Sequence, residues 1–187
     1  MYGRIYKNVY LNDRFPLNVA ISSGILISRC LEKPFNSQFL TFENNPEFYY
    51  CSPEKNLLQS IKDIIELETS FSINIFNLYK VFLDKCKNNN LEKNEIPNSI
   101  IIFSDLDLEL LDPNYKEHTK KVYKLFVNEN YNIPTLYIWN IYHKQISFKK
   151  DDNIVIINGF SNYIYKSFFE LGEFDITKLI KNRIKPI

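Results

Sequence analysis

The sequence predicts an α/β fold in which a mostly parallel central sheet is covered by helices on both faces. Short apolar, β-branched runs at 99–103, 134–140 and 154–157 predict three buried strands. A helical pattern over 114–129 separates the first two runs. Strands that alternate with helices favour parallel pairing. The run at 99–103, SIIIF, is continuously apolar, so we expect it to be the central strand.

The first half of the chain supplies further helices and an antiparallel edge hairpin. Apolar residues at steps of three and four from Asn74 to Cys86 predict an amphipathic helix. A buried helix is expected over 16–31, and Ser52-Pro53-Glu54 resembles a helix start, with the helix ending near Leu67. The remaining expected elements are a hairpin of 37–43 with 47–51, a first strand at 4–11, and closing helices at 160–171 and 175–183.

Composition indicates one soluble domain of 187 residues and nominates no partner. The formal net charge of +1 gives no global field that would attract nucleic acid or an anionic membrane. Cys30, Cys51 and Cys86 lack metal-ligand spacing, and we expect them to be buried free thiols in a reducing compartment. A signal peptide and an apolar run of membrane-spanning length are both lacking, so we expect a cytoplasmic protein.

Five stretches, in order along the chain, resemble a known family. They are PLNVAISSGILIS (16–28), FLTFENNPEF (39–48), SIIIFSDLDLE (99–109), IPTLYIWN (133–140) and INGFSNYIYKSFFE (157–170). Together they resemble the von Willebrand factor A (vWA)-like domain of a family of unknown function found in plants, fungi and large DNA viruses. That family is related to the vWA half of Ro-type RNA-binding proteins. The resemblance implies a single Rossmann-like vWA domain over 1–187, with a divergent or shortened first strand at about 4–11.

The resemblance also implies a ligand site at the carboxyl ends of the parallel strands, where such domains hold Mg²⁺ in a metal-ion-dependent adhesion site. Asp105, after the strand at 99–103, matches the acidic residue of the third ligand loop and is the only remnant. Ile73 stands where the second loop has Thr, and the three oxygen ligands of the first loop are replaced by Lys7, Val9 and Leu11. Because Mg²⁺ requires hard oxygen ligands, we expect a degenerate site and no cofactor.

Two other interpretations of Asp105 stay open. In one, a shifted register supplies oxygens to Mg²⁺ and gives a metal-dependent adhesion domain with rearranged ligands; the candidates are Asn12, Asp13, Thr69, Ser70 and Ser72. In the other, Asp105 caps the following turn through backbone hydrogen bonds.

No constellation of residues predicts an enzyme. Asp105, Asp107, Glu109 and Asp112 are interpreted as a solvated acidic loop. His118 and His143, the only histidines, lie beside lysines, and both are expected to be exposed.

The expected function is a noncatalytic protein-interaction or structural module, and the resemblance implies a protein of a large DNA virus. Its candidate binding rim is Asn12, Asp13, Thr69, Ser70, Ser72, Asp105 and Asn140. The alternative is a Ro-like RNA-associated protein that uses a basic surface with interleaved tyrosines: Lys116, Lys120, Lys121 and Lys124 on one helix, and Lys144, Lys149 and Lys150 in the loop beyond Trp139.

Overall fold

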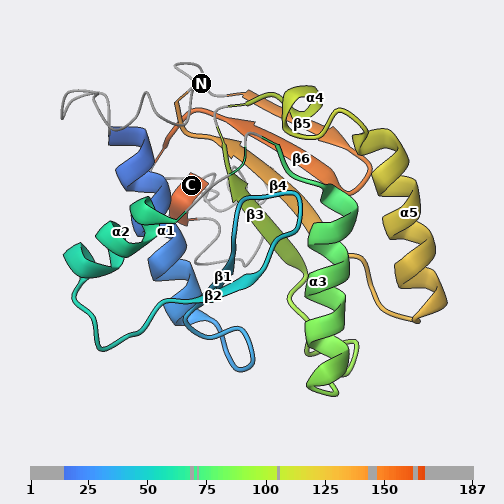
Figure 1. Cartoon of the computed structure of the whole chain (residues 1–187). Coiled ribbons are helices and arrows are strands. Elements are labelled where there is room, and N and C mark those ends of the chain that lie inside the picture. Colours follow the sequence, from blue (N-terminus) through green and yellow to red (C-terminus); the bar gives the residue numbers. More distant parts are fainter. Residues whose placement is uncertain are drawn as a thin grey trace, which may run out of the picture. The chain divides into compact units, whose positions relative to one another are not determined.

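The computed structural model describes residues 15–67, 70, 72–104, 106–142, 147–161 and 164–166. Figure 1 shows the ribbon of the chain with its helices and strands labelled. The chain divides into two compact units. The first contains 1–96 and 106–133, and the second contains 97–105 and 134–187. The expected strand at 4–11 and the helix at 175–183 lie outside the described residues. The single domain over 1–187 stays a prediction.

The first unit is mainly helical, and two of its helices begin where a polar side chain caps them. Asn56 and Gln59 form a reciprocal capping box, and Asn74 accepts a hydrogen bond from the backbone N–H of Asn77. The predicted helix start at Ser52 is wrong, because Ser52 accepts the Glu54 N–H in a turn and the capping box begins the helix later. The helices are α1 (Phe15–Cys30), α2 (Leu57–Glu66), α3 (Ile75–Asn88), α4 (Leu108–Leu111) and α5 (Tyr115–Asn128).

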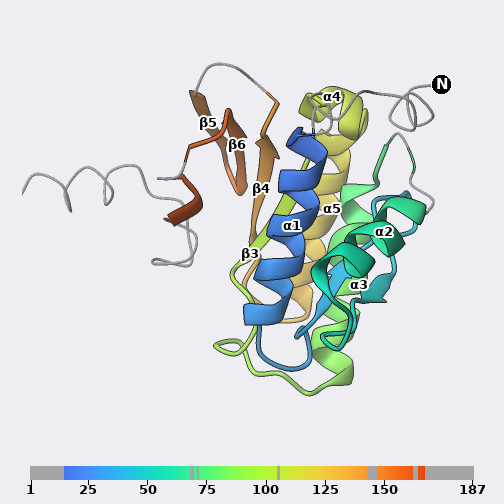
Figure 2. The ribbon, with the colours of Figure 1, turned by 90° about the vertical axis from the view of Figure 1, so that its left-hand side faces the viewer.

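The hairpin of the first unit is a separate two-stranded sheet. β1 (Gln38–Leu40) pairs antiparallel with β2 (Phe48–Tyr50). The prediction that it forms an edge of the parallel sheet is wrong, since the two sheets share no strand pairing. The physical reason is local packing: Phe39 and Tyr49 pack against a buried cluster built around Ile21 and Ile25 of α1. Figure 2 shows α1 and α2 side by side within this unit.

Helices α3 and α5 pack against each other, close to the ranges predicted from periodicity. The Tyr79 ring meets the Phe126 ring edge-on at 5.6 Å, and Phe82 of α3 stacks on Phe35 at 5.4 Å. Val122 and Phe126 are buried as expected, whereas Tyr115 and Leu125 are only half-buried. The amphipathic pattern therefore identified the packed faces of both helices.

The second unit holds a four-stranded mixed sheet, which confirms an α/β fold with mostly parallel pairing. In the order β3-β4-β6-β5, β3 pairs parallel with β4, and β4 parallel with β6, while β5 pairs antiparallel with β6. The strands are β3 (Ser99–Phe103), β4 (Thr135–Asn140), β5 (Ser147–Asp151) and β6 (Ile154–Asn158).

Two sequence-based expectations about this sheet are wrong for the described residues. The run at 99–103 is not central: β3 lies at the margin, and only Ile102 is buried, whereas four consecutive residues of β4 are buried. An apolar run looks alike in either position, so the pattern did not separate them. The segment taken for a loop beyond Trp139 contains β5, whose SFKKD sequence is largely exposed and therefore lacks the apolar signal of a buried strand.

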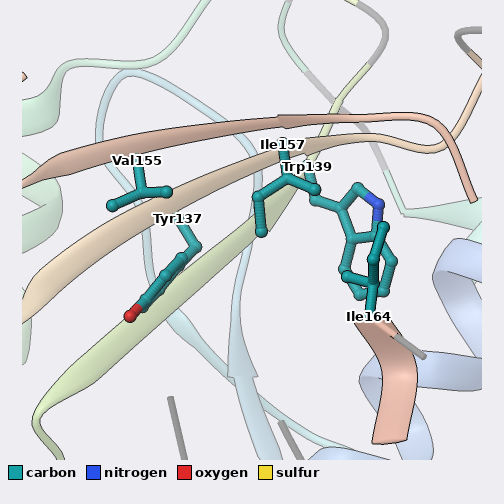
Figure 3. Close-up of a cluster of buried hydrophobic side chains, with 5 residues drawn as sticks. All are labelled: Tyr137, Trp139, Val155, Ile157 and Ile164. Atoms are coloured by element: carbon teal, nitrogen blue, oxygen red, sulfur yellow. The ribbon is translucent and has the colours of Figure 1, made fainter. Parts of the chain in front are cut away.

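One apolar cluster forms the core of the second unit (Figure 3). It contains Tyr137, Trp139, Val155, Ile157 and Ile164, all at most 9% exposed. Alternate residues of β4 and β6 point to this face, as the two-residue period of a strand requires. Ile164 comes from the short described piece of the helix expected at 160–171. That helices cover both faces of the sheet stays a prediction. No helix among the described residues is long and apolar enough to cross a membrane.

Candidate binding rim

The carboxyl ends of the parallel strands meet at one edge of the sheet. Phe103 of β3 lies in register with Trp139 of β4, and Asn140 of β4 lies in register with Asn158 of β6. Ligands of open α/β sheets bind outside this edge, which makes it the first candidate site. We refer to the ends of β3, β4 and β6, with the residues that follow each, as the carboxyl rim.

Hydrogen bonds inside the second unit engage the two asparagines of the carboxyl rim, Asn140 and Asn158. Asn140 Oδ1 accepts the Tyr142 N–H at 3.0 Å, and its main-chain oxygen accepts the Gly159 N–H at 2.8 Å. Asn158 Nδ2 donates to Ser147 Oγ at 2.9 Å. The Asn140 amide therefore ties the end of β4 to the turn that follows it, and the Asn158 amide ties β6 to the first residue of β5. Asn140, a predicted rim residue, has a structural role there.

The indole of Trp139 fixes the turn at the end of β6. Its Nε1 donates to the carbonyl oxygen of Gly159 at 2.8 Å, and the side chain is 1% exposed. Gly159 has a φ of 82°, a conformation that glycine adopts without a steric penalty. A buried indole needs such an acceptor, and here it anchors the turn that leads to Phe160.

Two aromatic rings are exposed beside the rim. Phe160 stacks on Trp139, with ring centroids 6.4 Å apart and planes 14° from parallel, and is 37% exposed. Tyr142, two residues after β4, is 56% exposed. The rim therefore offers flat apolar surface of the kind enriched at protein interfaces.

The structure tests only part of the predicted rim. Asn12, Asp13, Thr69 and Asp105 lie outside the described residues. Ser70 and Ser72 belong to the first unit, where the Ser70 N–H donates to Phe42 O at 2.9 Å. Ser72 Oγ is 3.5 Å from Asn44 Oδ1. Asn140 belongs to the second unit. The single rim that joins all seven residues stays a prediction.

Among the described residues, no group of three or more His, Cys, Asp or Glu side chains is arranged to hold a metal ion. Ile73, at the position of the expected Thr ligand, is 3% exposed, and its N–H donates to Leu111 O at 2.9 Å. An apolar side chain thus fills this position.

Sequence reasoning missed a buried carboxylate in the first unit. Asp112 is 1% exposed and accepts hydrogen bonds from the N–H of Ile75 and of Asn114, both at 3.0 Å. His118 Nδ1 lies 2.7 Å from Asp112 Oδ2, with 13% of the histidine side chain exposed. The predictions of a solvated Asp112 and an exposed His118 are therefore wrong. The turn sequence Asp112-Pro113-Asn114 indicates the local hydrogen bond to the Asn114 N–H but not the burial of the carboxylate.

The chemistry of this Asp–His pair is limited by its surroundings. The other ring nitrogen, His118 Nε2, lies 3.5 Å from the side-chain nitrogen of Asn74. In the described part of the chain, neither nitrogen has a recorded hydrogen bond to a hydroxyl or thiol, so no nucleophile is paired with this histidine. Its observed contacts connect the N-terminus of α3 to α5.

Four lysines of the predicted basic surface lie on α5, and one of them, Lys121, pairs with an acidic residue. Lys116, Lys120, Lys121 and Lys124 are all exposed. Lys121 Nζ lies 2.7 Å from Glu117 Oε1, and this hydrogen bond holds the pKa of the Glu117 carboxyl below its usual range. Lys149 and Lys150 lie on β5 and not in a loop, while His143 and Lys144 are outside the described residues.

The three cysteines are free thiols, but only two are buried. Cys51 and Cys86 are buried, and burial raises the pKa of the Cys86 thiol to about 11. Cys30, the last residue of α1, is exposed, so its predicted burial is wrong. The last residue of a helix lies at the margin of the packed face, where the apolar pattern no longer decides burial.

The described fold defines an α/β protein with a mixed, mostly parallel sheet and a separate hairpin. The chain belongs to the family described as domain of unknown function DUF7788, whose sequence profile matches residues 3–185. It is also similar to an uncharacterized protein of Acanthamoeba polyphaga mimivirus, with 24% identity over 176 residues. This match covers 91% of the chain and 31% of the viral protein, so the chain spans about a third of that relative. No solved structure matches the chain.

Proposed function

We propose that this chain is a noncatalytic interaction module that binds a protein partner through the carboxyl rim of its sheet. The proposal includes the finer assignment of a divergent vWA-like fold with a degenerate metal-ion-dependent adhesion site. The family match and the mostly parallel sheet support this assignment at a coarser level.

The observation that carries the proposal is the division of roles at the rim. The side chains of Asn140 and Asn158 make hydrogen bonds within the unit, whereas the rings of Tyr142 and Phe160 are exposed beside them. A rigid strand end that presents aromatic rings is suited to apolar contact with another protein, because such rings bury large area at low entropic cost. Trp139 helps to hold the Phe160 ring in place, because the two rings stack.

Two further observations support binding rather than catalysis. The buried Ile73 occupies the position of an expected oxygen ligand. The Asp112–His118 pair, a potential acid/base group, has its recorded contacts with backbone N–H groups and with the Asn74 amide. Ile73 therefore serves packing at the position of a metal ligand. The Asp112–His118 pair likewise has contacts that hold the fold together.

A photo-crosslinking experiment tests the proposed surface. A benzophenone amino acid replaces Tyr142 in the rim or, as a matched control, Tyr50 in the first unit; the two tyrosines are 56% and 57% exposed. Irradiation in the native source should give a discrete protein adduct from position 142, and the adduct should be suppressed by excess unlabelled wild-type chain. The same adducts from both positions, or none from position 142, would contradict the proposal.

The viral relative supports a proposal about where the chain acts. Since the mimivirus protein is similar over 91% of this chain, we extend to the chain a role as a component or accessory protein of a large DNA virus. Such a protein is found in the host cytoplasm or in the virion. Quantitative proteomics of purified particles and of infected cytoplasm checks this, and a chain detected only in uninfected cells would contradict it.

A further inference from the structure

The outward side of α5 carries a narrow face of lysine, tyrosine and valine side chains. At about 100° per residue, five positions of this helix fall within an arc of roughly 100°. They are Lys116, Lys120, Tyr123, Lys124 and Val127, which we call the α5 outer face.

Packing within the first unit holds the α5 outer face toward solvent. Val122 and Phe126, on the opposite side of the helix, are 3% and 0% exposed, and Phe126 packs against Tyr79 of α3. On the outer face, Tyr123 is 62% exposed and all three lysines are exposed. A rotation of α5 that buried this face would therefore break the contacts of α5 with α3.

The charge of the α5 outer face is positive without internal compensation. The arc contains no acidic residue, and Lys120 and Lys124 have no ion-pair partner among the described residues. Glu117 lies on the flank of the face and pairs with Lys121. Lys121, part of the basic surface predicted from the sequence, is thus neutralised, and the effective cationic set is smaller than predicted.

Spacing and aromatic content together indicate the kind of partner. Lysines at i, i+4 and i+8 are separated by about 6 Å per step along the helix axis, which suits successive phosphates of an extended strand. Tyr123 lies at the edge of this arc and next to Lys124 in the sequence, and an exposed ring beside cations is the platform on which unpaired bases stack. A face that only solvates the helix would not require an exposed Tyr and an exposed Val, which is 56% exposed at position 127.

We propose that the α5 outer face binds single-stranded RNA. Lys116, Lys120 and Lys124 contact consecutive phosphates, and the ring of Tyr123 stacks on a base. This inference is independent of the function proposed for the carboxyl rim, because it uses other residues in the other compact unit.

Fluorescence anisotropy with a labelled 12-residue oligouridine tests the proposal on the full chain. Between 50 and 200 mM KCl the affinity should fall with salt, and the Lys116→Gln, Lys120→Gln, Lys124→Gln variant should bind at least tenfold more weakly. Each phosphate contact contributes about 0.7 to the logarithmic salt slope for single strands, so the triple variant should lose about 2 from that slope. Tyr123→Ala should weaken binding about fivefold or more and leave the salt slope unchanged.

A matched triple variant separates a site from general attraction to cations. Lys33, Lys62 and Lys80 are exposed lysines elsewhere in the first unit, and their change to Gln removes the same charge. This control should retain wild-type affinity, with circular dichroism confirming that all variants are folded. Equal losses in the two triple variants, absence of binding at 50 mM KCl, or equal displacement by an acidic peptide of the same charge would each overturn the proposal.

Discussion

Asp112, in the turn between α4 and α5, contacts His118 of α5 at 2.7 Å between carboxylate Oδ2 and imidazole Nδ1. The same carboxylate accepts the N–H of Ile75, the first residue of α3, and of Asn114, just before α5. A negative charge at helix N-termini is favourable, because the first N–H groups of a helix lack partners within it. Asp112 thus accepts one backbone N–H at the start of each of α3 and α5, in addition to the Asn74 cap of α3.

Replacement of Asp112 by Ala should be strongly destabilising. It leaves two backbone N–H groups and an imidazole without their acceptor in a buried site, which typically costs about 3 kcal/mol or more. Urea denaturation followed by circular dichroism measures the free energy of unfolding. Glu109→Ala is the control, since Glu109 is an exposed acidic residue of the adjacent α4, and its loss should change stability by less than about 0.5 kcal/mol. Equal effects of the two changes would contradict the capping role.

Lys85 should stabilise the packing of the hairpin on α3. Its Nζ donates to Gln38 Oε1 at 2.6 Å and lies 4.2 Å from the centroid of the Phe48 ring, and burial lowers the pKa of its ammonium group. Lys85→Ala should therefore lower the unfolding free energy by about 1–2 kcal/mol. Lys80→Ala, an exposed lysine on the same helix, should have little effect. Thermal melts of both variants make the comparison, and equal melting temperatures would show that the Lys85 contacts contribute nothing.

The three thiols should differ in reactivity. The thiolate is the attacking species, and burial raises the pKa of Cys86 to about 11, so this thiol stays protonated at pH 8. Cys30 is exposed, and we expect it alone to react rapidly with Ellman's reagent in the folded protein. Because the folded pKa of Cys86 is raised, its contribution to stability is complete below the unfolded value near 9 and is lost as pH rises toward about 11.

Two variants check this assignment of reactivity. Cys30→Ser should abolish the rapid phase of labelling, and Cys86→Ser should leave it unchanged. Rapid labelling that persists in the Cys30→Ser variant would place a second accessible thiol in the native chain. Addition of denaturant should expose Cys51 and Cys86 and bring the number of reactive thiols to three, the count in the sequence.

Hydrophobic periodicity predicted the helices and strands that pack in the core. It did not predict an exposed strand or the position of a strand within the sheet. The range 74–86 closely matches α3, because six buried side chains of this helix follow helical spacing. The strand β5 has no comparable signal, since its lysines face solvent at a sheet edge. Likewise, the edge position of β3 depends on which segments pair with it, and that information is absent from the five residues themselves.

The site residues show the same limit. Gln59, three residues after Asn56, marks a capping box that could be recognised from the sequence. The burial of Asp112 could not, because one of its donors is the backbone N–H of Ile75, 37 positions away. The exposed residues Tyr142 and Phe160 can be assigned to the same edge of the sheet only from the register, which places Asn140 beside Asn158.

Magnesium binding is the test of the degenerate metal site. Mg²⁺ holds oxygen ligands in near-octahedral geometry, and the position expected to supply a Thr oxygen is filled by the buried side chain of Ile73. Isothermal titration of the full chain with Mg²⁺ and Mn²⁺ should therefore show no sub-millimolar binding. Ile73→Thr alone should not create a site, because the first ligand loop would still carry Lys7, Val9 and Leu11. Sub-millimolar binding that Asp105→Ala abolishes would instead establish the rearranged site, with oxygens drawn from residues such as Asn12 or Thr69.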